Sequence, residues 1–250
     1  MDLEQRVCVV TGAGSGIGAA GARAFARAGA QVVVADVNAD AARAVAGEIG
    51  DAASAVAVDV ADEASVDALL EQVLARHGRL DVLWANAGIA GFRAPCADQP
   101  TDTWENVLRV NLTGVFFSFR AALRPMLDAG RGVLLATASV AGLEASAGSP
   151  AYHVAKAGVV MLARHVALAY GPKGIRCNAI CPGLTDTPIL DPFAAGLGGR
   201  DVMFAAQLKR IPLRRVGEPE DVADAAVFLA SDAASYVNGV AFRVDGGMAT

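Results

Sequence analysis

Tyr152 and Lys156 are four residues apart in a stretch with helical character, so both side chains are expected on one face of a helix. Tyrosine is a poor base at its ordinary pKa of about 10. A nearby ammonium favours the phenolate and lowers that pKa, which would allow proton exchange with an alcohol or a ketone near neutral pH. Alone, such a pair is usually an ordinary surface pair. Here Ser139 lies 13 residues upstream at the end of an apolar run, which favours a chemical role.

A glycine-rich loop, Thr11-Gly12-Ala13-Gly14-Ser15-Gly16-Ile17-Gly18, lies between an apolar run and an Ala-rich helical stretch. Glycines let the backbone approach a phosphate group, and a helix N-terminus offers free N–H groups and a positive dipole end. The spacing is T-G-x-x-x-G-x-G rather than the plain G-x-G-x-x-G. The alternative is a merely tight turn, but the strand before the loop and the helix after it favour a nucleotide site.

Asp36 stands 24 residues beyond Gly12, at the end of the second apolar run. A carboxylate here can accept hydrogen bonds from both ribose hydroxyls of an adenosine. It would repel a 2′-phosphate, because like charges ~4 Å apart cost about 4 kcal/mol at an effective dielectric constant of ~20. A phosphate-preferring site would want an arginine nearby, yet Ser15 and Val37 flank the place. We therefore predict NAD rather than NADP; the alternative for Asp36 is an N-cap near residues 38–40.

Short β-branched runs alternate with longer Ala-rich stretches along the chain, which is typical of βαβ units and a parallel sheet. The predicted strands are 7–10, 31–35, 55–58, 80–84, 132–138, 174–180 and 240–244. The predicted helices are 17–28, 40–48, 62–77, 102–129, 151–170 and 218–230. Asp62 is expected to cap the third helix, and Asp102 with Glu105 to start the fourth. The pattern indicates one α/β domain over residues 1–250.

Glycines and polar residues follow almost every predicted strand, and ligands bind beyond the carboxyl ends of strands in an open parallel sheet. The residues in question are the glycine loop, Asp36, Asp59, Asn86-Ala87-Gly88, Ser139 and Pro182-Gly183. All of them are expected at one edge of the sheet. One excursion, Leu184 to Arg215, departs from the βαβ rhythm and is predicted to be a substrate lid over about 184–215.

The composition excludes several classes of protein. Apolar residues make up 54% of the 250 residues and the net charge is −5, so nucleic acid and an anionic membrane surface are not expected partners. No signal peptide and no apolar run of ~20 residues is visible, which favours a cytoplasmic location. The three histidines form no ligand cluster and no metal is expected. Cys177 and Cys181 are expected to be buried, inert thiols.

Taken together, these residues resemble the motif set of the classical short-chain dehydrogenases/reductases. The matching segments are Thr11-Gly12-x3-Gly16-Ile17-Gly18, Asn86-Ala87-Gly88, Asn111, Ser139, Tyr152-His153-Val154-Ala155-Lys156, Pro182-Gly183 and Val244-Asp245-Gly246-Gly247. The resemblance spans essentially the whole chain, and the set is specific only jointly. It implies a Rossmann-type, doubly wound, mostly parallel sheet of seven strands with helices on both faces. Ala85, where the family often has a second asparagine, is a small departure.

The resemblance also implies site residues and an activity, hydride transfer between nicotinamide and a carbonyl or alcohol carbon. It implies Tyr152 as general acid/base, Lys156 as the group that holds the ribose and lowers the Tyr152 pKa, Ser139 as the substrate's hydrogen-bond partner, and Asn111 as the holder of a proton-relaying water. The implied cofactor-binding residues are Gly12, Ser15, Gly16, Ile17, Gly18, Asp36, Asp59, Val60, Asn86, Gly88, Tyr152, Lys156, Pro182, Gly183, Thr185 and Thr187.

Several other residues each have two candidate roles, one in binding and one in packing. Phe92, Leu184, Ile189, Phe193 and Phe204 are candidates for an apolar substrate pocket or for the core, and Glu144 and Ser146 are candidate polar contacts. His153 is expected at the pocket rim or in packing, because adjacent helix residues face different ways. The family's tetramers suggest a homo-oligomer, for which Val159, Leu162 and Val166 would form a seam unless they pack on the sheet.

The function predicted from the sequence is an NAD-dependent oxidoreductase that acts on a secondary alcohol or the matching ketone. Alternatives in the same family are a 3-oxoacyl-[acyl-carrier-protein] reductase, which usually uses NADPH, and a sugar dehydrogenase. An NAD-binding sensor or scaffold on the same fold is the alternative outside enzymes.

Overall fold

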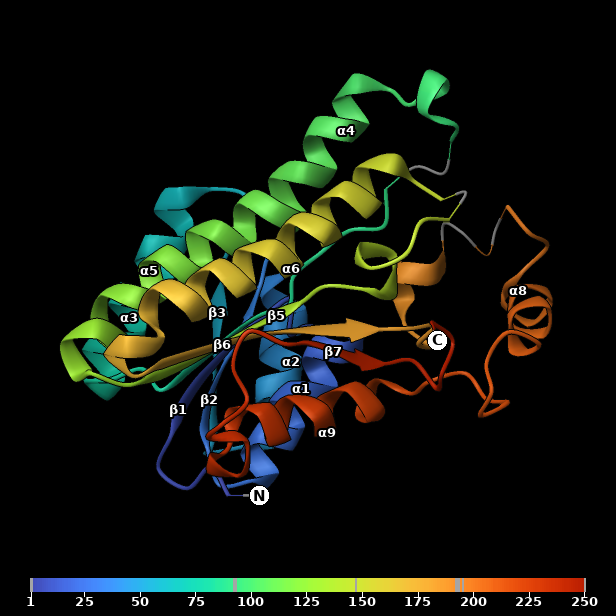
Figure 1. Ribbon diagram of the computed structural model, residues 1–250. Helices are drawn as coiled ribbons and strands as arrows, with labels where there is room; N and C mark the ends of the chain where they lie inside the picture. The colour runs from blue at the N-terminus through green and yellow to red at the C-terminus, as the bar shows by residue number, and fades with distance from the viewer. Residues whose placement is uncertain (1, 92–93, 147, 192–193, 195, 250) are drawn as a thin grey trace.

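A seven-stranded parallel sheet with strand order β3-β2-β1-β4-β5-β6-β7 forms the centre of the molecule (Figure 1). The computed structural model describes residues 2–91, 94–146, 148–191, 194 and 196–249. The strands are β1 (Val7–Thr11), β2 (Gln31–Asp36), β3 (Ala53–Ala57), β4 (Val82–Ala85), β5 (Gly132–Thr137), β6 (Ile175–Pro182) and β7 (Ala241–Val244). The described pairings are all parallel. The doubly wound α/β fold predicted from the sequence is confirmed, with the strand order reversing beside β1.

Helices cover both faces of this sheet (Figure 1). One face carries α1 (Gly16–Arg27), α2 (Ala39–Ile49) and α9 (Pro219–Ala230); the other carries α3 (Glu63–His77), α5 (Gly114–Ala129) and α6 (Pro150–Tyr170), with α4 (Thr101–Leu108) leading into α5. A further helix, α8 (Arg200–Leu208), lies away from the sheet.

Alternate residues of each strand feed two separate hydrophobic cores. Val9, Leu83 and Leu134 pack against α3, α5 and α6, whereas their chain neighbours Val10 and Trp84 pack against α1 and α9. All five side chains are fully buried, and each such burial stabilises the fold by roughly 1.5–3 kcal/mol. The sheet is therefore stabilised by buried side chains on both of its faces.

The helix boundaries follow the predicted caps in most places. Asp62 accepts a hydrogen bond from the Ala64 N–H and Gly78 takes the left-handed conformation after α3, both as expected. The expected start at Asp102 is wrong, because α4 already begins at Thr101 and the Asp102 carboxylate accepts from the adjacent Thr103 N–H.

The predicted helix over residues 102–129 is not one regular helix. α4 and α5 are joined by a π-helical turn, Arg109–Thr113, with helical backbone angles on both sides. A π-turn accommodates an extra residue inside a helix and is frequent at functional sites.

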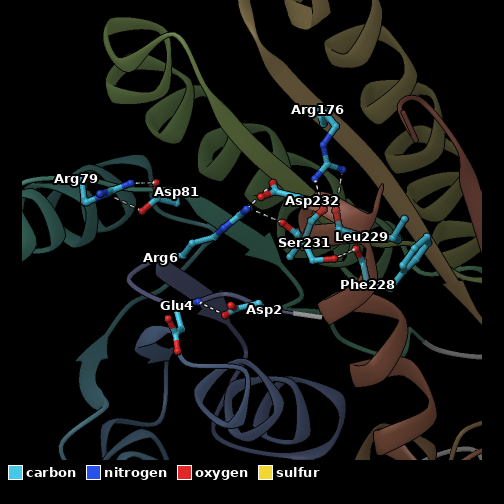
Figure 2. A network of polar contacts seen from close by, with 11 residues as sticks. Asp2, Glu4, Arg6, Arg79, Asp81, Arg176, Phe228, Leu229, Ser231 and Asp232 are labelled. Carbon is cyan, nitrogen blue, oxygen red and sulfur yellow. Dashed lines mark hydrogen bonds and ion pairs between the residues drawn. The ribbon is translucent and has the colours of Figure 1, made fainter. Parts of the chain in front are cut away.

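The C-terminus of α9 is held by two arginines at the amino-terminal edge of the sheet (Figure 2). Arg176 donates to the Leu229 and Ser231 carbonyls, at 2.7 and 3.0 Å, and Arg6 donates to the Ala230 carbonyl at 2.8 Å and pairs with Asp232. The guanidinium groups satisfy the carbonyls that a helix end leaves without intrahelical partners, and their charge suits the negative end of the helix dipole.

The segment after β6 contains structure of its own. A 3-10 turn, Pro188–Leu190, is followed by α8, and Thr185 forms a parallel bridge with Gly217. Arg200, the first residue of α8, pairs with Asp186 and Asp191 and donates to the Thr187 carbonyl at 2.7 Å. These contacts connect α8 to Asp186, Thr187 and Asp191 in the segment after β6.

One stretch, Pro150–Lys173, is long and apolar enough to cross a membrane by length and composition alone, with a mean hydropathy of 1.2. It is not an uninterrupted apolar run, because Lys156 and Arg164 lie within it, in agreement with the expectation from the sequence. In the fold this stretch is α6 and its following turn, and its side chains Val159, Ala163 and Val166 are buried in the core against the sheet. Packing against the sheet accounts for the apolar residues on one side of this helix, and 39% of its apolar window is buried inside the protein.

Candidate active site

A cavity of about 930 Å³ opens at the carboxyl ends of the strands. Nearly all of the site residues predicted from the sequence line it: Gly12, Ser15, Gly16, Ile17, Asp36, Asp59, Val60, Asn86, Gly88, Ser139, Tyr152, Lys156, Pro182, Gly183, Thr185 and Thr187. Two predicted residues, Gly18 and Asn111, are not part of its wall. The parallel sheet thus brings together segments that are far apart in the chain.

The glycine loop joins β1 to the N-terminus of α1. Gly12 and Gly16 have φ angles of +64° and +50°, which a side chain would strain. Gly18 lies one turn into α1, where a Cβ would stand 2.1 Å from the Gly12 carbonyl oxygen. Position 18 therefore needs a glycine because α1 packs closely on the loop, and not because a side chain there would enter the cavity. The first N–H groups of α1 have no intrahelical partner and face the loop region.

The Asp36 carboxylate is fixed at the end of β2 by two backbone groups. It accepts hydrogen bonds from the Gly14 N–H and the Asn38 N–H, both at 2.9 Å. The N-cap of α2 is Asn38, whose side chain accepts from Asp40 and Ala41, so the alternative role of Asp36 as N-cap is wrong. Asp36 is held at the cavity wall as an oriented carboxylate.

Asn86 is the centre of a partly buried polar cluster beneath the loop. Its amide donates to the carbonyls of Thr11 at 3.1 Å and Gly12 at 3.3 Å, and it accepts from the Thr137 hydroxyl at 2.8 Å. Thr137 in turn accepts from the Trp84 indole at 2.9 Å. Sequence reasoning missed Thr137, because a threonine at the end of a strand is also what strand propensity favours.

Tyr152 lies in the first turn of α6, after Ser149, which caps the helix. Its side chain is hydrogen-bonded to that of Ser139, the residue that follows β5 by two positions. Burial raises the pKa of Tyr152 above its usual range, and the Ser139 hydrogen bond opposes this rise. The expected lowering of the Tyr152 pKa is wrong for the protein alone, because the loss of hydration outweighs the polar partner.

Lys156 is buried one turn further along α6. Its Nζ donates to the Thr137 carbonyl at 2.7 Å and lies 5.6 Å from the centroid of the Tyr152 ring. Burial lowers the pKa of Lys156 from 10.5 to about 8. The amine therefore titrates close to physiological pH.

Asn111 is fully buried inside the π-turn, behind the cavity wall. Its side chain pairs with both backbone groups of Ile89, accepting from the N–H and donating to the carbonyl, each at 2.8 Å. A Cβ on Gly88 would lie 3.2 Å from Asn111 Oδ1 and 3.5 Å from Lys156 Nζ. Asn111 and Lys156 thus approach the same backbone position from two helices.

The opposite side of the cavity is lined mostly by the segment after β6. Leu184, Ile189, Glu144 and Ser146 line the cavity as expected. Phe204 does not, and Phe92 and Phe193 lie outside the described residues. Sequence reasoning missed several residues that line this side, among them Leu190, Leu197, Met203, Gln207, Arg210 and Met248, since nothing in their spacing marks them.

His153 lies at the rim of this side, as expected. Its ring nitrogens lie 2.9 Å from Ser146 Oγ and 2.8 Å from the Ser149 carbonyl oxygen. Both ring nitrogens are engaged, so His153 joins the 139–149 loop to α6.

Two further expectations concern residues away from the cavity centre. Cys177 and Cys181 are free and buried, and burial raises the pKa of Cys181 to about 11, as expected for inert thiols. Of the two alternatives for α6, packing on the sheet holds: Val159 and Val166 are buried in the core, and Leu162 is partly buried against it.

Comparison with known proteins agrees with this geometry. Residues 12–249 match the family model described as Enoyl-(Acyl carrier protein) reductase. Cis-4-hydroxycyclohexanecarboxylate dehydrogenase of Sinomonas cyclohexanicum is 48% identical over 246 residues, which cover 97% of this chain and 96% of that protein. The crystal structure of 3-ketoacyl-(acyl-carrier-protein) reductase from Brucella melitensis complexed with NADH has a TM-score of 0.92 and 35% identity, and the match covers 100% of both chains.

A second structure, of a putative NAD(P) dependent gluconate 5-dehydrogenase from Beutenbergia cavernae with bound NADP at low occupancy, has a TM-score of 0.92 and 40% identity, covering 99% of this chain and 98% of that one. The chain therefore belongs to the short-chain dehydrogenase/reductase family. It is an oxidoreductase whose fold binds a nicotinamide cofactor.

The residues present fit such a cofactor. A Cβ on Gly12 would lie 2.7 Å from the Ala87 Cα, and one on Gly16 would lie 3.2 Å from a Thr187 methyl group, so the glycine loop is open only because it lacks side chains. The helix N-terminus faces the loop where a pyrophosphate would need N–H donors. Asp36 offers an acceptor for ribose hydroxyls at the far end of the same cavity.

Proposed function

We propose that this protein is an NAD-dependent dehydrogenase that interconverts a secondary alcohol and its ketone, with Tyr152 as general acid/base. The observation that carries the proposal is the hydrogen bond between the Tyr152 and Ser139 side chains inside a cavity that also holds the buried amine of Lys156. A substrate oxygen placed between the two hydroxyl groups would be within reach of a proton donor and a second hydrogen-bond donor.

The proposed roles follow from the surroundings of each side chain. A bound nicotinamide cofactor supplies the hydride acceptor or donor. In the reduction, Tyr152 gives its proton to the ketone oxygen, and burial supports this role because it keeps the phenol protonated. In the oxidation, the Tyr152 phenolate takes the proton back from the alcohol. Lys156 is protonated below about pH 8 and then stabilises the phenolate by its charge. Ser139 orients the substrate oxygen. Asn111 holds the Ile89 backbone next to Gly88, the position that Lys156 also approaches, and we place the proton relay to solvent there.

The remaining lining residues are proposed to bind the cofactor. The glycine loop would hold the pyrophosphate, Asp59 and Val60 would contact the adenine, and the residues after β6 would contact the nicotinamide. The full proposed set is Gly12, Ser15, Gly16, Ile17, Asp36, Asp59, Val60, Asn86, Gly88, Tyr152, Lys156, Pro182, Gly183, Thr185 and Thr187, with Gly18 supporting the loop by packing.

Asp36 supports NAD over NADP. Two backbone N–H groups orient its carboxylate, so it cannot turn away from a 2′-phosphate without losing both hydrogen bonds. Neither Ser15 nor Val37, which also line this end of the cavity, carries a compensating positive charge.

The wall contributed by Leu184, Ile189, Leu190, Leu197 and Met203 favours a hydrocarbon substrate such as an alicyclic alcohol. The cyclohexane ring in the name of the relative from Sinomonas cyclohexanicum supports the same class. A 3-oxoacyl reductase or a sugar dehydrogenase remains the alternative, and the few polar groups on this wall argue against a sugar.

The proposal is tested with Tyr152→Phe and purified wild-type protein. Wild type should reduce NAD in the presence of cyclohexanol or a substituted cyclohexanol, measured as absorbance of NADH. The variant should lose turnover by at least about 10²–10⁴-fold while its dissociation constant for NADH, measured by fluorescence, stays within about threefold. Turnover retained by the variant would refute the role of Tyr152.

We further propose a cytoplasmic homo-oligomer, with a tetramer favoured, and no nucleic-acid or membrane partner. Apolar side chains recur every seven residues on the outer side of α6, at Val154, Met161 and Leu168, and are 48%, 61% and 82% exposed. Phe116 of α5 is also exposed. An apolar stripe of this kind favours helix pairing between subunits.

A further inference from the structure

The substrate side of the cavity combines an apolar wall with two charged side chains, Arg210 and Glu144. The other charged lining residues are accounted for elsewhere. Asp36 and Asp59 follow the strands on the glycine-loop side, and Lys156 is bonded to Thr137. Arg109, in the π-turn, donates to Asn106.

Arg210 differs from the other arginines of its segment because it has no partner among the described residues. Arg200 binds two aspartates and a carbonyl, Arg215 makes two hydrogen bonds to Asp221, and Arg214 donates to the carbonyls of Leu208 and Lys209. In the described part of the chain, no hydrogen bond or ion pair engages the Arg210 guanidinium, which lines the cavity. An unpaired guanidinium has five donors free for a planar anion.

The backbone at Arg210 is anchored on both sides. Its N–H donates to the Gln207 carbonyl at 2.8 Å. The next residue, Ile211, is buried, and its Cγ2 lies 2.8 Å from the position that a Cβ on Gly246 would take. Arg210 therefore projects from a fixed point between α8 and the C-terminal turn that carries Met248 into the cavity wall.

Gln207 lines the same region, and its Oε1 is buried with no hydrogen-bond partner among the residues that the structure describes. Rotation of the amide by 180° exchanges Oε1 and Nε2, and it would present an N–H donor at the same place. Gln207 and Arg210 thus offer neighbouring donors beside the apolar side chains of Met203 and Met248.

We propose that Arg210, assisted by Gln207, binds a carboxylate carried by the substrate, so that the physiological substrate is a hydroxy acid whose hydrocarbon skeleton separates its carboxylate from the reacting hydroxyl. The assignment rests on the proposed function, because it takes the hydroxyl to lie between Tyr152 and Ser139. Glu144 repels a carboxylate, which orients the acid toward Arg210. A planar guanidinium matches a carboxylate with two parallel hydrogen bonds.

The kinetic test compares Arg210→Gln with Lys209→Gln, which removes the same charge from the adjacent exposed residue outside the cavity wall. The substrates are cis-4-hydroxycyclohexanecarboxylate and its uncharged methyl ester, with NAD as cofactor. For Arg210→Gln, the ratio of kcat/KM for the acid to that for the ester should fall about 10- to 50-fold, chiefly through the KM of the acid. Lys209→Gln should keep the wild-type ratio. An equal loss for acid and ester, or the same loss in both variants, would overturn the assignment.

A binding test needs no turnover. Cyclohexanecarboxylate, which lacks the hydroxyl, is titrated into wild type and Arg210→Gln by calorimetry, with and without NADH. Wild type should bind it about tenfold or more tightly than the variant does, and Arg210→Lys should bind with intermediate affinity. Equal affinity, or no binding to wild type, would reject the carboxylate site. Binding that depends on Arg210 in a protein that oxidises no alcohol would instead reject the proposed function and keep the anion site.

Discussion

Arg200 offers a direct test of how the segment after β6 supports the cofactor side of the cavity. Its guanidinium donates to the Thr187 carbonyl at 2.7 Å and to Asp191 at 2.8 Å, and pairs with Asp186. Thr187 is buried, and its methyl group lies against Gly16 of the glycine loop. Arg200→Gln should therefore release Thr187 from its position beside the loop and weaken cofactor binding without touching the cofactor.

The size of the effect follows from the exposure of the cluster. A hydrogen bond to a charged group contributes about 1.5–3 kcal/mol when it is shielded from water, but exposed ion pairs contribute only about 0–1 kcal/mol. The Arg200 side chain is 31% exposed and that of Asp186 is 42% exposed, so we take about 1–2 kcal/mol for the whole cluster. At about 1.4 kcal/mol per tenfold change, the dissociation constant for NADH should rise about 5- to 30-fold.

The assay is NADH fluorescence titration of wild type, Arg200→Gln and a matched control, Arg215→Gln. The control removes an arginine that also pairs with an aspartate, Asp221, but lies outside the cavity wall. Both variants should unfold a few degrees below wild type, whereas only Arg200→Gln should bind NADH more weakly. Wild-type affinity in Arg200→Gln, or the same loss in the control, would refute the argument.

Two further predictions test the cofactor preference and the buried lysine. Asp36→Asn removes the charge but keeps an oxygen that can accept one backbone N–H, so the ratio of kcat/KM for NAD to that for NADP should fall about 30- to 100-fold in steady-state assays; an unchanged ratio would contradict charge repulsion. Burial lowers the pKa of Lys156 to about 8, so the unfolded chain binds more protons than the folded protein between about pH 8 and 10.5. The free energy of unfolding of cofactor-free wild type should therefore rise relative to Lys156→Met as the pH rises through that window, measured by urea denaturation, and a difference that does not vary with pH would argue against a buried, titrating amine.

The edge of the sheet that holds the site was predictable from the sequence because topology leaves little choice. Once the strands are parallel, the residues that follow them must meet at one edge. Asp36, Asp59, Asn86 and Ser139 were placed by that argument alone, and all of them line the cavity.

Features that depend on packing could not be predicted in this way. Asn111 lies in a π-turn, where its amide binds the backbone of Ile89. This contact joins two distant segments, and no local pattern in the sequence predicts it. The direction of the Tyr152 pKa shift depends on burial, which outweighs the polar partner. α6 is apolar on two sides, so its sequence does not say that Val159 packs on the sheet while Met161 is exposed.

The arginine network at the end of α9 lies at the edge of the sheet opposite to the cavity. A strand of five residues spans roughly 17 Å, and the arginine network shares no residue with the cavity wall. Loops around the cavity can therefore diverge between relatives while the far rim keeps the scaffold intact. This separation makes the fold suitable for altering substrate preference by exchange of the loops around the cavity, while the hydrogen bonds of Arg6 and Arg176 at the other edge are kept.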